Sequence, residues 1–490
     1  MLRKNTFDTC GGTDRLMPLP AGACARLPAR SAAASGGTIL TGGAAEERGG
    51  LGRHPPHRSR RCPAGATPCA SLFPRNAFNT HPPVFLLSQI DEINNTPGIT
   101  WTAGMNRFAD LPIGASSSMI GARAPTPEEL ATMDGIEVIP ADATHPSGLT
   151  KADIPTGYDA RVGFPKCAKT IGDIRDQSMC GCCWAFGTAE AASDRLCIST
   201  EGKTIMPLSA QDLCFNSNPD GCNGGSPNAA WDYIKAHGIV SGKQQAFAAG
   251  TKGPDPDNFA GESTCSDFSL PHCHHHGPVG ADPFPAEGAP GCRQQKSPKG
   301  PKECDSSSKK KYASDKYTFE GQVQMVGQNE TYLQAEIMAN GPVTVAFTVF
   351  SDFEAYGKNT AQPAILVATL NSRNIPLKIA CVMLMTAGGV YIKSPNAKMA
   401  GGHAVKMLGW GTDSTSGKAV DYWLIANSWN PYWGEKGYFR IERGANDCGI
   451  AASVNYTANL APIISGTFLR DCALQAVAAS GDSKWKLPGQ

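Results

Sequence analysis

Three stretches of the chain carry a pattern that predicts helices. Residues 84–93 place apolar side chains at helical spacing, 183–196 is rich in Ala with no Pro, and 226–236 is a further helical stretch. The Ala-rich stretch should begin its helix at Cys183. A segment at 101–108 follows a Pro-Gly turn, and together with 84–93 it should form a small structured region.

The second half of the chain has a different pattern. Runs of β-branched and aromatic residues between Gly and Pro predict strands over 342–350, 403–408, 422–427 and 437–441. Helices followed by strands indicate an α+β fold in two lobes.

Composition divides the chain into regions. Residues 1–83 are rich in Gly, Pro, Ala, Arg and Ser without periodicity, so we interpret them as disordered or as upstream sequence foreign to the protein. Residues 109–150 return to Pro, Ala, Ser and Thr, which is typical of an exposed linker that a protease could cut. The main domain opens near Ile154, and residues 458–490 should form a disordered tail.

Charge and cysteine content narrow the function. The chain has 44 Lys+Arg against 43 Asp+Glu, a net charge of +1, and no apolar run long enough for a bilayer. These values argue against a nucleic-acid-binding protein and against an integral membrane protein. The 18 cysteines and sequons at Asn94, Asn329 and Asn455 indicate an oxidising compartment, although no apolar signal-peptide region follows the basic start.

The sharpest motif is Gln177-Ser-Met-Cys-Gly-Cys-Cys-Trp-Ala-Phe186. It is followed far downstream by Gly401-Gly-His403-Ala and by Ala426-Asn427-Ser-Trp429. This ordered set resembles the papain family of cysteine peptidases. The resemblance implies a papain-like two-lobe fold, with a helical left lobe, a β-barrel-like right lobe and an N-terminal propeptide.

The resemblance also assigns catalytic roles. Cys183 is implied as the nucleophile, activated by His403 and by the helix N-terminus, while Asn427 orients the imidazole. Trp429 resembles the indole that shields the His–Asn hydrogen bond, and Gln177 would donate to the oxyanion. Cys182 stands where the family has Ser or Ala, so two adjacent thiols compete for the nucleophile, and we assign Cys183 because it immediately precedes Trp184.

Within the family, the cathepsin B branch is the most similar. Residues 265–276 contain a Cys-x7-Cys unit ending in adjacent histidines, which resembles the start of an occluding loop spanning about 265–304. By position, His275 and His276 would hold the substrate's C-terminal carboxylate and give peptidyl-dipeptidase activity. Residues 100–106 resemble the short prosegment of this branch, so 84–150 would be propeptide and linker and 151–457 the peptidase domain.

Substrate contacts follow from the same resemblance. Pro227, Ala346 and Ala404 match apolar walls of the S2 pocket, while Ser453 replaces the acidic residue at its base, so Phe or Leu should be preferred over Arg at P2. Gly224 and Gly225 resemble the backbone edge that pairs with an extended substrate.

Family spacing implies a disulfide framework. The expected pairs are Cys167 with Cys197, Cys180 with Cys222, Cys265 with Cys304 and Cys273 with Cys292. Cys214, Cys381 and Cys472 have no clear partners, and Cys448 resembles a free buried thiol.

Other interpretations remain open. The run His272–His276 could bind zinc, although adjacent residues cannot all converge on one tetrahedral ion. The chain could instead be an inactive homologue that binds peptides or inhibitors. Residues 358–387 are absent from the family pattern, and we interpret them as a retained intron or a similar gene-model error.

The leading expectation is a zymogen of a cysteine peptidase. Its partners would be peptide and protein substrates, its own propeptide as an intramolecular inhibitor, and cystatin-type inhibitors, with no cofactor and no metal. The location implied is lysosomal or endosomal, or secreted.

Overall fold

The described structure covers most of the expected prosegment and peptidase domain. The computed structural model describes residues 84–104, 106, 108, 114–123, 136–244, 258–259, 261–272, 294–319, 321–326, 328–357, 388–446, 448–451 and 455–458. All of these belong to one compact unit, His81–Gln490, while the other unit, Met1–Thr80, lies outside the described residues. Our expectations for 1–83, for 358–387 and for 459–490 therefore concern residues outside this description.

The predicted helices form close to their expected bounds. Helix α1 spans Val84–Asn94, α5 spans Cys183–Ser199 and α7 spans Pro227–His237. Two further helices, α6 (Ala210–Ser217) and α8 (Glu330–Asn340), begin after Ser209 and Asn329, whose side chains cap Asp212 N and Tyr332 N. The short helices are α3 (Ala160–Gly163), α4 (Ala168–Ile171), η1 (Ala115–Ser118), η2 (Pro165–Cys167), η3 (Gly221–Asn223), η5 (Tyr312–Ser314) and η6 (Phe353–Ala355).

The strands assemble into one sheet. The four predicted strands are β5 (Val343–Phe350), β7 (Met399–Asp413), β8 (Val420–Ala426) and β9 (Tyr438–Glu442). The others are β1 (Trp101–Thr102), β2 (Ile136–Ile139), β3 (Tyr158–Asp159), β4 (Val323–Val326), β6 (Gly388–Tyr391) and β10 (Asn455–Ala458). Their order is β1-β6-β9-β8-β7-β5-β10-β4-β2, with β3 paired to β7.

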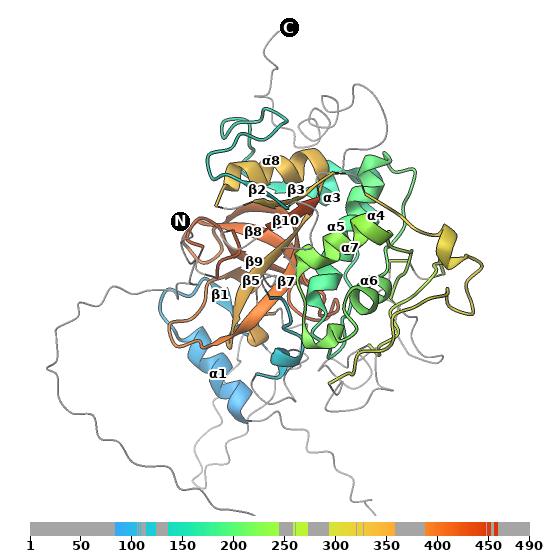
Figure 1. Ribbon diagram of the computed structural model, residues 1–490. Coiled ribbons are helices and arrows are strands. Elements are labelled where there is room, and N and C mark those ends of the chain that lie inside the picture. Colours follow the sequence, from blue (N-terminus) through green and yellow to red (C-terminus); the bar gives the residue numbers. More distant parts are fainter. Residues whose placement is uncertain are drawn as a thin grey trace, which may run out of the picture. The chain divides into compact units, whose positions relative to one another are not determined.

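Helices and strands segregate as the α+β pattern predicts. Figure 1 shows α4–α7 gathered beside the sheet, with α8 across another side of it. Separate apolar clusters support the two-lobe interpretation: one contains Trp184, Trp231 and Phe268 around the helices, and another contains Trp410 and Trp423 among the strands. Strand β7 lies between them, because its Ala404 belongs to the helical cluster while Val405 belongs to the strand cluster.

The linker expected over 109–150 is more structured than its composition indicates. Strand β2 pairs in parallel with β4, and Ile139 is buried. His145 is only 5% exposed, and its Nε2 lies 2.7 Å from Glu336 Oε2 in α8. Most of 136–150 is exposed, so the composition indicated solvent contact correctly but gave no sign of these two anchors.

Candidate active site

The candidate nucleophile lies at the start of the central helix. Helix α5 begins at Cys183, and the side chain is fully buried. Its Sγ accepts a hydrogen bond from Gly121 N at 3.4 Å and another from the main chain of Ala404. The positive end of the helix dipole favours a thiolate at this position.

Histidine and asparagine come from neighbouring strands. His403 lies in β7, opposite Phe347 of β5, and Asn427 directly follows β8. His403 Nε2 is 2.8 Å from Asn427 Oδ1, and the His403 ring lies 5.0 Å from the Trp429 ring. Among the described residues, His403 Nδ1 has no hydrogen-bond partner. Ala404, the next residue along β7, contacts the Cys183 sulfur through its main chain, so His403 is the sequence neighbour of a residue that touches the candidate nucleophile.

Gln177 hydrogen-bonds to Ser428, which follows Asn427, and to backbone carbonyls near Cys183. Its backbone N donates to Ser428 O at 2.9 Å, and its Oε1 accepts from Ser428 Oγ at 2.7 Å. Its Nε2 donates to Cys180 O at 2.7 Å and to Met119 O at 2.8 Å. The Gln177 side-chain amide, which we expect to stabilise an oxyanion, thus donates to the peptide carbonyl of Met119.

At neutral pH, Cys183 and His403, the expected catalytic pair, are both neutral in this structure. Burial raises the pKa of Cys183 to about 11, and burial likewise lowers the pKa of His403 to about 4 although Asn427 opposes that shift. The ion pair implied by the family resemblance is therefore not the favoured form here. A thiolate on Cys183 and an imidazolium on His403 can form once water reaches them or once each is stabilised by the opposite charge of the other.

Residues 119–123, which we call the crossing segment, lie across these groups. Gly225 N donates to Gly121 O at 2.8 Å, and Arg123 N donates to Gly225 O at 3.0 Å. On the opposite side, Ala122 N donates to Gly402 O at 3.0 Å. The segment forms a parallel bridge between Ala122 and Gly225, so it occupies the backbone edge that we expected to bind substrate.

Close approach at Gly121 depends on the absence of a side chain. A Cβ at this position would lie 1.9 Å from Gly181 O. Gly224 adds a second requirement, because its φ of 104° is unfavourable for residues with a side chain. Backbone therefore meets backbone directly beside Cys183.

The upstream part of the N-terminal segment docks on the sheet. Strand β1 pairs with β6, and Trp101 Nε1 donates to Ile392 O at 2.8 Å. Asn106 Nδ2 donates to Tyr356 O at 3.2 Å, and the Phe108 ring lies 5.2 Å from Trp429. The expected prosegment thus contacts Trp429, whose ring packs against the His403 ring.

Only part of the expected substrate pocket can be located. Ala346 and Ala404 are register partners on β5 and β7, and they share an apolar cluster with Ala122 of the crossing segment. Pro227 is buried at the first position of α7. Ser453, His275 and His276 lie outside the described residues, so their assignments stay predictions.

Three of the expected disulfides are present, namely Cys167–Cys197, Cys180–Cys222 and Cys265–Cys304. The fourth pair, Cys273 with Cys292, lies outside the described residues, as do Cys381 and Cys472. Cys448 is buried, as expected.

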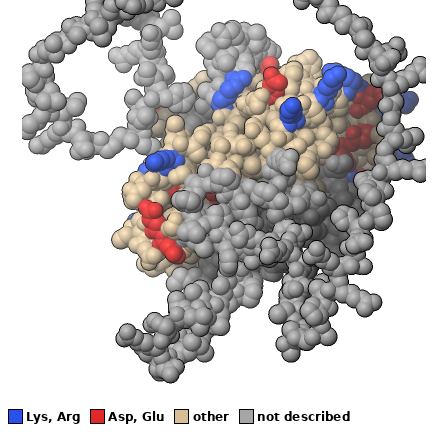
Figure 2. Space-filling view, turned by 90° about the horizontal axis from the view of Figure 1, so that it is seen from below, with Lys and Arg blue, Asp and Glu red and all other residues tan. Residues whose placement is uncertain are grey.

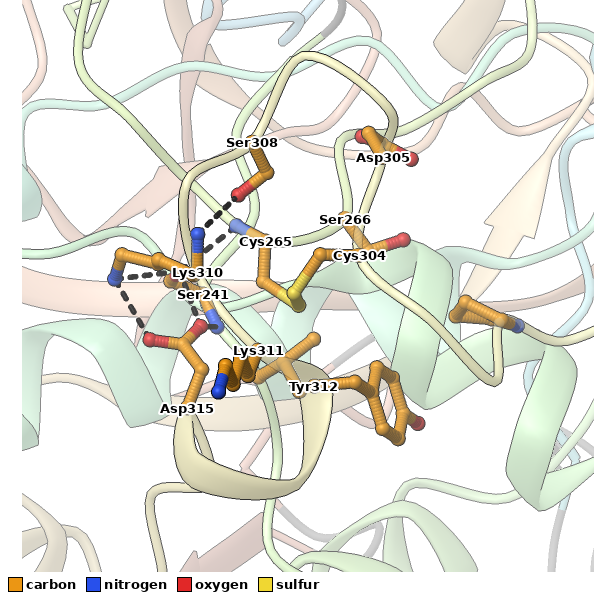
Figure 3. The surroundings of a disulfide bond; sticks show 12 residues. Ser241, Cys265, Ser266, Cys304, Asp305, Ser308, Lys310, Lys311, Tyr312 and Asp315 are labelled. Carbon is orange, nitrogen blue, oxygen red and sulfur yellow. Dashed lines mark hydrogen bonds and ion pairs between the residues drawn. A yellow bond between two sulfur atoms is a disulfide. The ribbon is translucent and has the colours of Figure 1, made fainter.

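The base of the expected occluding loop is fixed around one of these bonds. Figure 3 shows Cys265–Cys304 beside Lys310, whose Nζ lies 2.7 Å from Asp315 Oδ1 and 3.0 Å from Ser241 Oγ. Ser241 Oγ in turn accepts from Cys265 N at 3.0 Å. The part of the loop that would carry the paired histidines is not described.

The described residues offer neither a metal cluster nor a membrane-spanning helix. Within the described ranges, no cluster of three or more His, Cys, Asp or Glu side chains could hold a metal ion; of the His272–His276 run only His272 is described. No described helix is long and apolar enough to cross a membrane. On the face seen in Figure 2, acidic and basic side chains are interspersed, in agreement with the near-neutral net charge.

Residues outside the sequence motifs complete the site. Met119, Gly121 and Ala122, which no motif includes, cover it, and Ser428, which lies within the Asn427 motif but had no assigned role, hydrogen-bonds to Gln177. Ser428 could have been noticed as a neighbour of Asn427, whereas the crossing segment has no periodicity that would reveal its location.

Known proteins resemble this chain in sequence and in fold. The papain family cysteine protease profile matches residues 154–375 and 367–458. Cathepsin B-like cysteine proteinase 6 of Caenorhabditis elegans is 38% identical over 306 residues, covering 62% of this chain and 66% of that protein. The cathepsin B-like cysteine proteinase of Schistosoma japonicum is 37% identical over 304 residues, covering 62% of this chain and 72% of that protein.

Among solved structures, procathepsin B S9 of Trypanosoma congolense aligns with a TM-score of 0.52 and 23% identity. The alignment covers 76% of this chain and 98% of that one, and it supports the fold. The cysteine at the helix start, the His–Asn pair from neighbouring strands β7 and β8 and these similarities agree with one another. The chain belongs to the papain family of cysteine proteases, and its relatives include cathepsin B-like proteinases.

Proposed function

We propose that this chain is the zymogen of a cathepsin B-like peptidase that hydrolyses peptide bonds with Cys183 and His403. One observation carries the proposal: the crossing segment bonds to the Cys183 sulfur and to the Gln177 amide at once. A peptide backbone can therefore lie across the nucleophile and the expected oxyanion donor together. In this position the segment acts as the intramolecular inhibitor, and its removal would open the site.

The arrangement supports covalent catalysis once the segment is removed. His403 takes the Cys183 proton, and the thiolate attacks the scissile carbonyl to form a tetrahedral oxyanion. Gln177 Nε2 and the Cys183 backbone N–H donate to that oxygen. His403 then protonates the leaving amine, and water hydrolyses the thioester and regenerates the thiol. Asn427 keeps the imidazole oriented, and Trp429 covers their hydrogen bond.

Specificity follows from the pocket residues. Pro227, Ala346 and Ala404 would form apolar walls, and Ser453 would leave the base uncharged, so Phe or Leu at P2 is favoured over Arg. His275 and His276 would hold a free C-terminal carboxylate and add peptidyl-dipeptidase activity to endopeptidase activity.

The setting proposed is lysosomal, endosomal or extracellular. Partners would be peptide and protein substrates and cystatin-type inhibitors. Buried disulfides support an oxidising route of synthesis. An inactive homologue is disfavoured, because His403 and Asn427 retain a 2.8 Å contact that a pure binding protein does not require.

The test uses the acid-processed full chain and fluorogenic peptides with Phe-Arg or Arg-Arg before the reporter. Phe-Arg should be cleaved with the higher kcat/KM, Cys183→Ala should abolish cleavage, and Cys182→Ser should retain it. A peptide ending in a free carboxylate, compared with its amide, reports dipeptidase activity. Absence of cleavage after complete removal of the prosegment would refute the peptidase proposal.

A further inference from the structure

Two thiols that form no disulfide in the structure meet beside the nucleophile. Cys182 is the residue before α5, Cys214 lies in α6, and both side chains are fully buried. The two side chains belong to one buried apolar cluster and interact with each other, and Cys182 Sγ also lies 3.8 Å from Gln177 O. Cys214, which had no evident partner in the sequence, therefore has a neighbour of matching chemistry.

The segments carrying these thiols are already joined at an adjacent point. The Cys180–Cys222 disulfide links them, and Gly181 N donates to Cys222 O at 2.9 Å. A Cβ on Gly221 would lie 2.4 Å from Cys214 Sγ, so the sulfur packs directly on this backbone. A disulfide between Cys182 and Cys214, with a sulfur–sulfur bond of about 2.05 Å, would add a second link at this junction.

We propose that Cys182 and Cys214 form a further disulfide when the chain folds in an oxidising compartment. The inference rests on the route of synthesis included in the proposed function. Each thiol loses its proton, the two sulfurs bond, and the two electrons reduce a disulfide oxidant such as glutathione disulfide to two thiols. Burial and the neighbouring Cys214 raise the pKa of Cys182, which disfavours the thiolate that disulfide exchange needs. The bond should therefore form during folding, before the two side chains are buried.

This bond would change the chemistry beside the nucleophile. It would fasten the start of α5 to α6 and leave Cys183 as the free thiol of the Cys180–Cys183 loop. Cys182 could then neither compete for thiol reagents nor bond to Cys183. Cys182, which stands where the family has Ser or Ala, would then leave Cys183 as the single reactive thiol beside the site.

The test counts thiols in the secreted full chain. The protein is denatured in N-ethylmaleimide without reductant and digested with trypsin, which releases peptides 176–195 and 204–235 still joined through Cys180–Cys222. The proposal predicts one maleimide on this joined pair, located on Cys183. Cys214→Ser is the matched control and should carry two labels, on Cys182 and Cys183.

Other label patterns would overturn the proposal. Three labels on the wild-type pair would mean that both thiols remain reduced, and one label on a cysteine other than Cys183 would mean a different bond. The result does not depend on catalysis, so an inactive protein with one label on Cys183 would refute the proposed function and leave this inference standing.

Discussion

Replacing Gly121 by Ala should loosen the crossing segment from the nucleophile. The new methyl group would lie 1.9 Å from Gly181 O, a backbone atom that cannot rotate away. Gly121 does not have a positive φ, so the substitution acts through this clash and not through backbone strain.

The magnitude follows from the hydrogen bonds that the shift disturbs. Gly225 N to Gly121 O and Arg123 N to Gly225 O are two backbone bonds that the crossing segment makes beside the clash. Losing two bonds at about 1 kcal/mol each weakens the closed state by about 2 kcal/mol. Because 1.4 kcal/mol corresponds to a factor of ten, the open fraction should rise roughly 30-fold.

The assay measures how fast the unprocessed chain reacts at Cys183 with a thiol-directed epoxide at neutral pH. Labelling of Gly121→Ala should be roughly 30-fold faster than that of the wild type. Ser117→Ala, an exposed change in η1, is the control and should react at the wild-type rate. If Gly121→Ala reacts as slowly as the control, the crossing segment does not protect the nucleophile.

Two further predictions concern stability and modification. Burial opposes ionisation of Glu336, but Arg195 and His145 outweigh it and lower its pKa to about 2, so its stabilisation is full above about pH 4.5 and is lost as pH falls toward 2. The free energy of unfolding, measured with urea on a Cys183→Ala background, should fall by about 3 kcal/mol as the pH drops through this window. Glu336→Gln should abolish that fall, and an unchanged pH profile in this variant would contradict the ion-pair account. Asn94 and Asn329 should carry no glycan, because their Nδ2 groups donate to Ala103 O and Ala143 O, and glycopeptide mass analysis showing occupancy would contradict this expectation.

Local pattern predicted much of the fold. The Ala-rich run after Cys183 was sufficient for α5, and β-branched runs were sufficient for β5 and β8, because these elements are long and well punctuated. Helices α6 and α8 were not expected, although Ser209 and Asn329 are ordinary N-cap residues. Helix α6 has only 8 residues, which leaves little periodicity to recognise. Helix α8 is as long as α1 and α7, but its side chains from Tyr332 to Met338 are all buried, so no alternation of apolar and polar faces marks it.

Tertiary contacts explain the remaining differences. His145 sits in a Pro-containing, polar stretch, and only its buried contact with Glu336 shows why that stretch is anchored. Likewise, the motifs identified Cys183 and Gln177, but not that the crossing segment would bond to both. Backbone contacts of this kind depend on the three-dimensional path of the chain and leave little trace in residue type.

The most direct test of the account is epoxide labelling of the acid-processed chain at about pH 5.5, followed by peptide mass mapping. We expect label on Cys183, little label before processing, and loss of label in His403→Ala. Label on Cys182, or none after complete processing, would contradict the assignment of Cys183 and His403 as the catalytic pair.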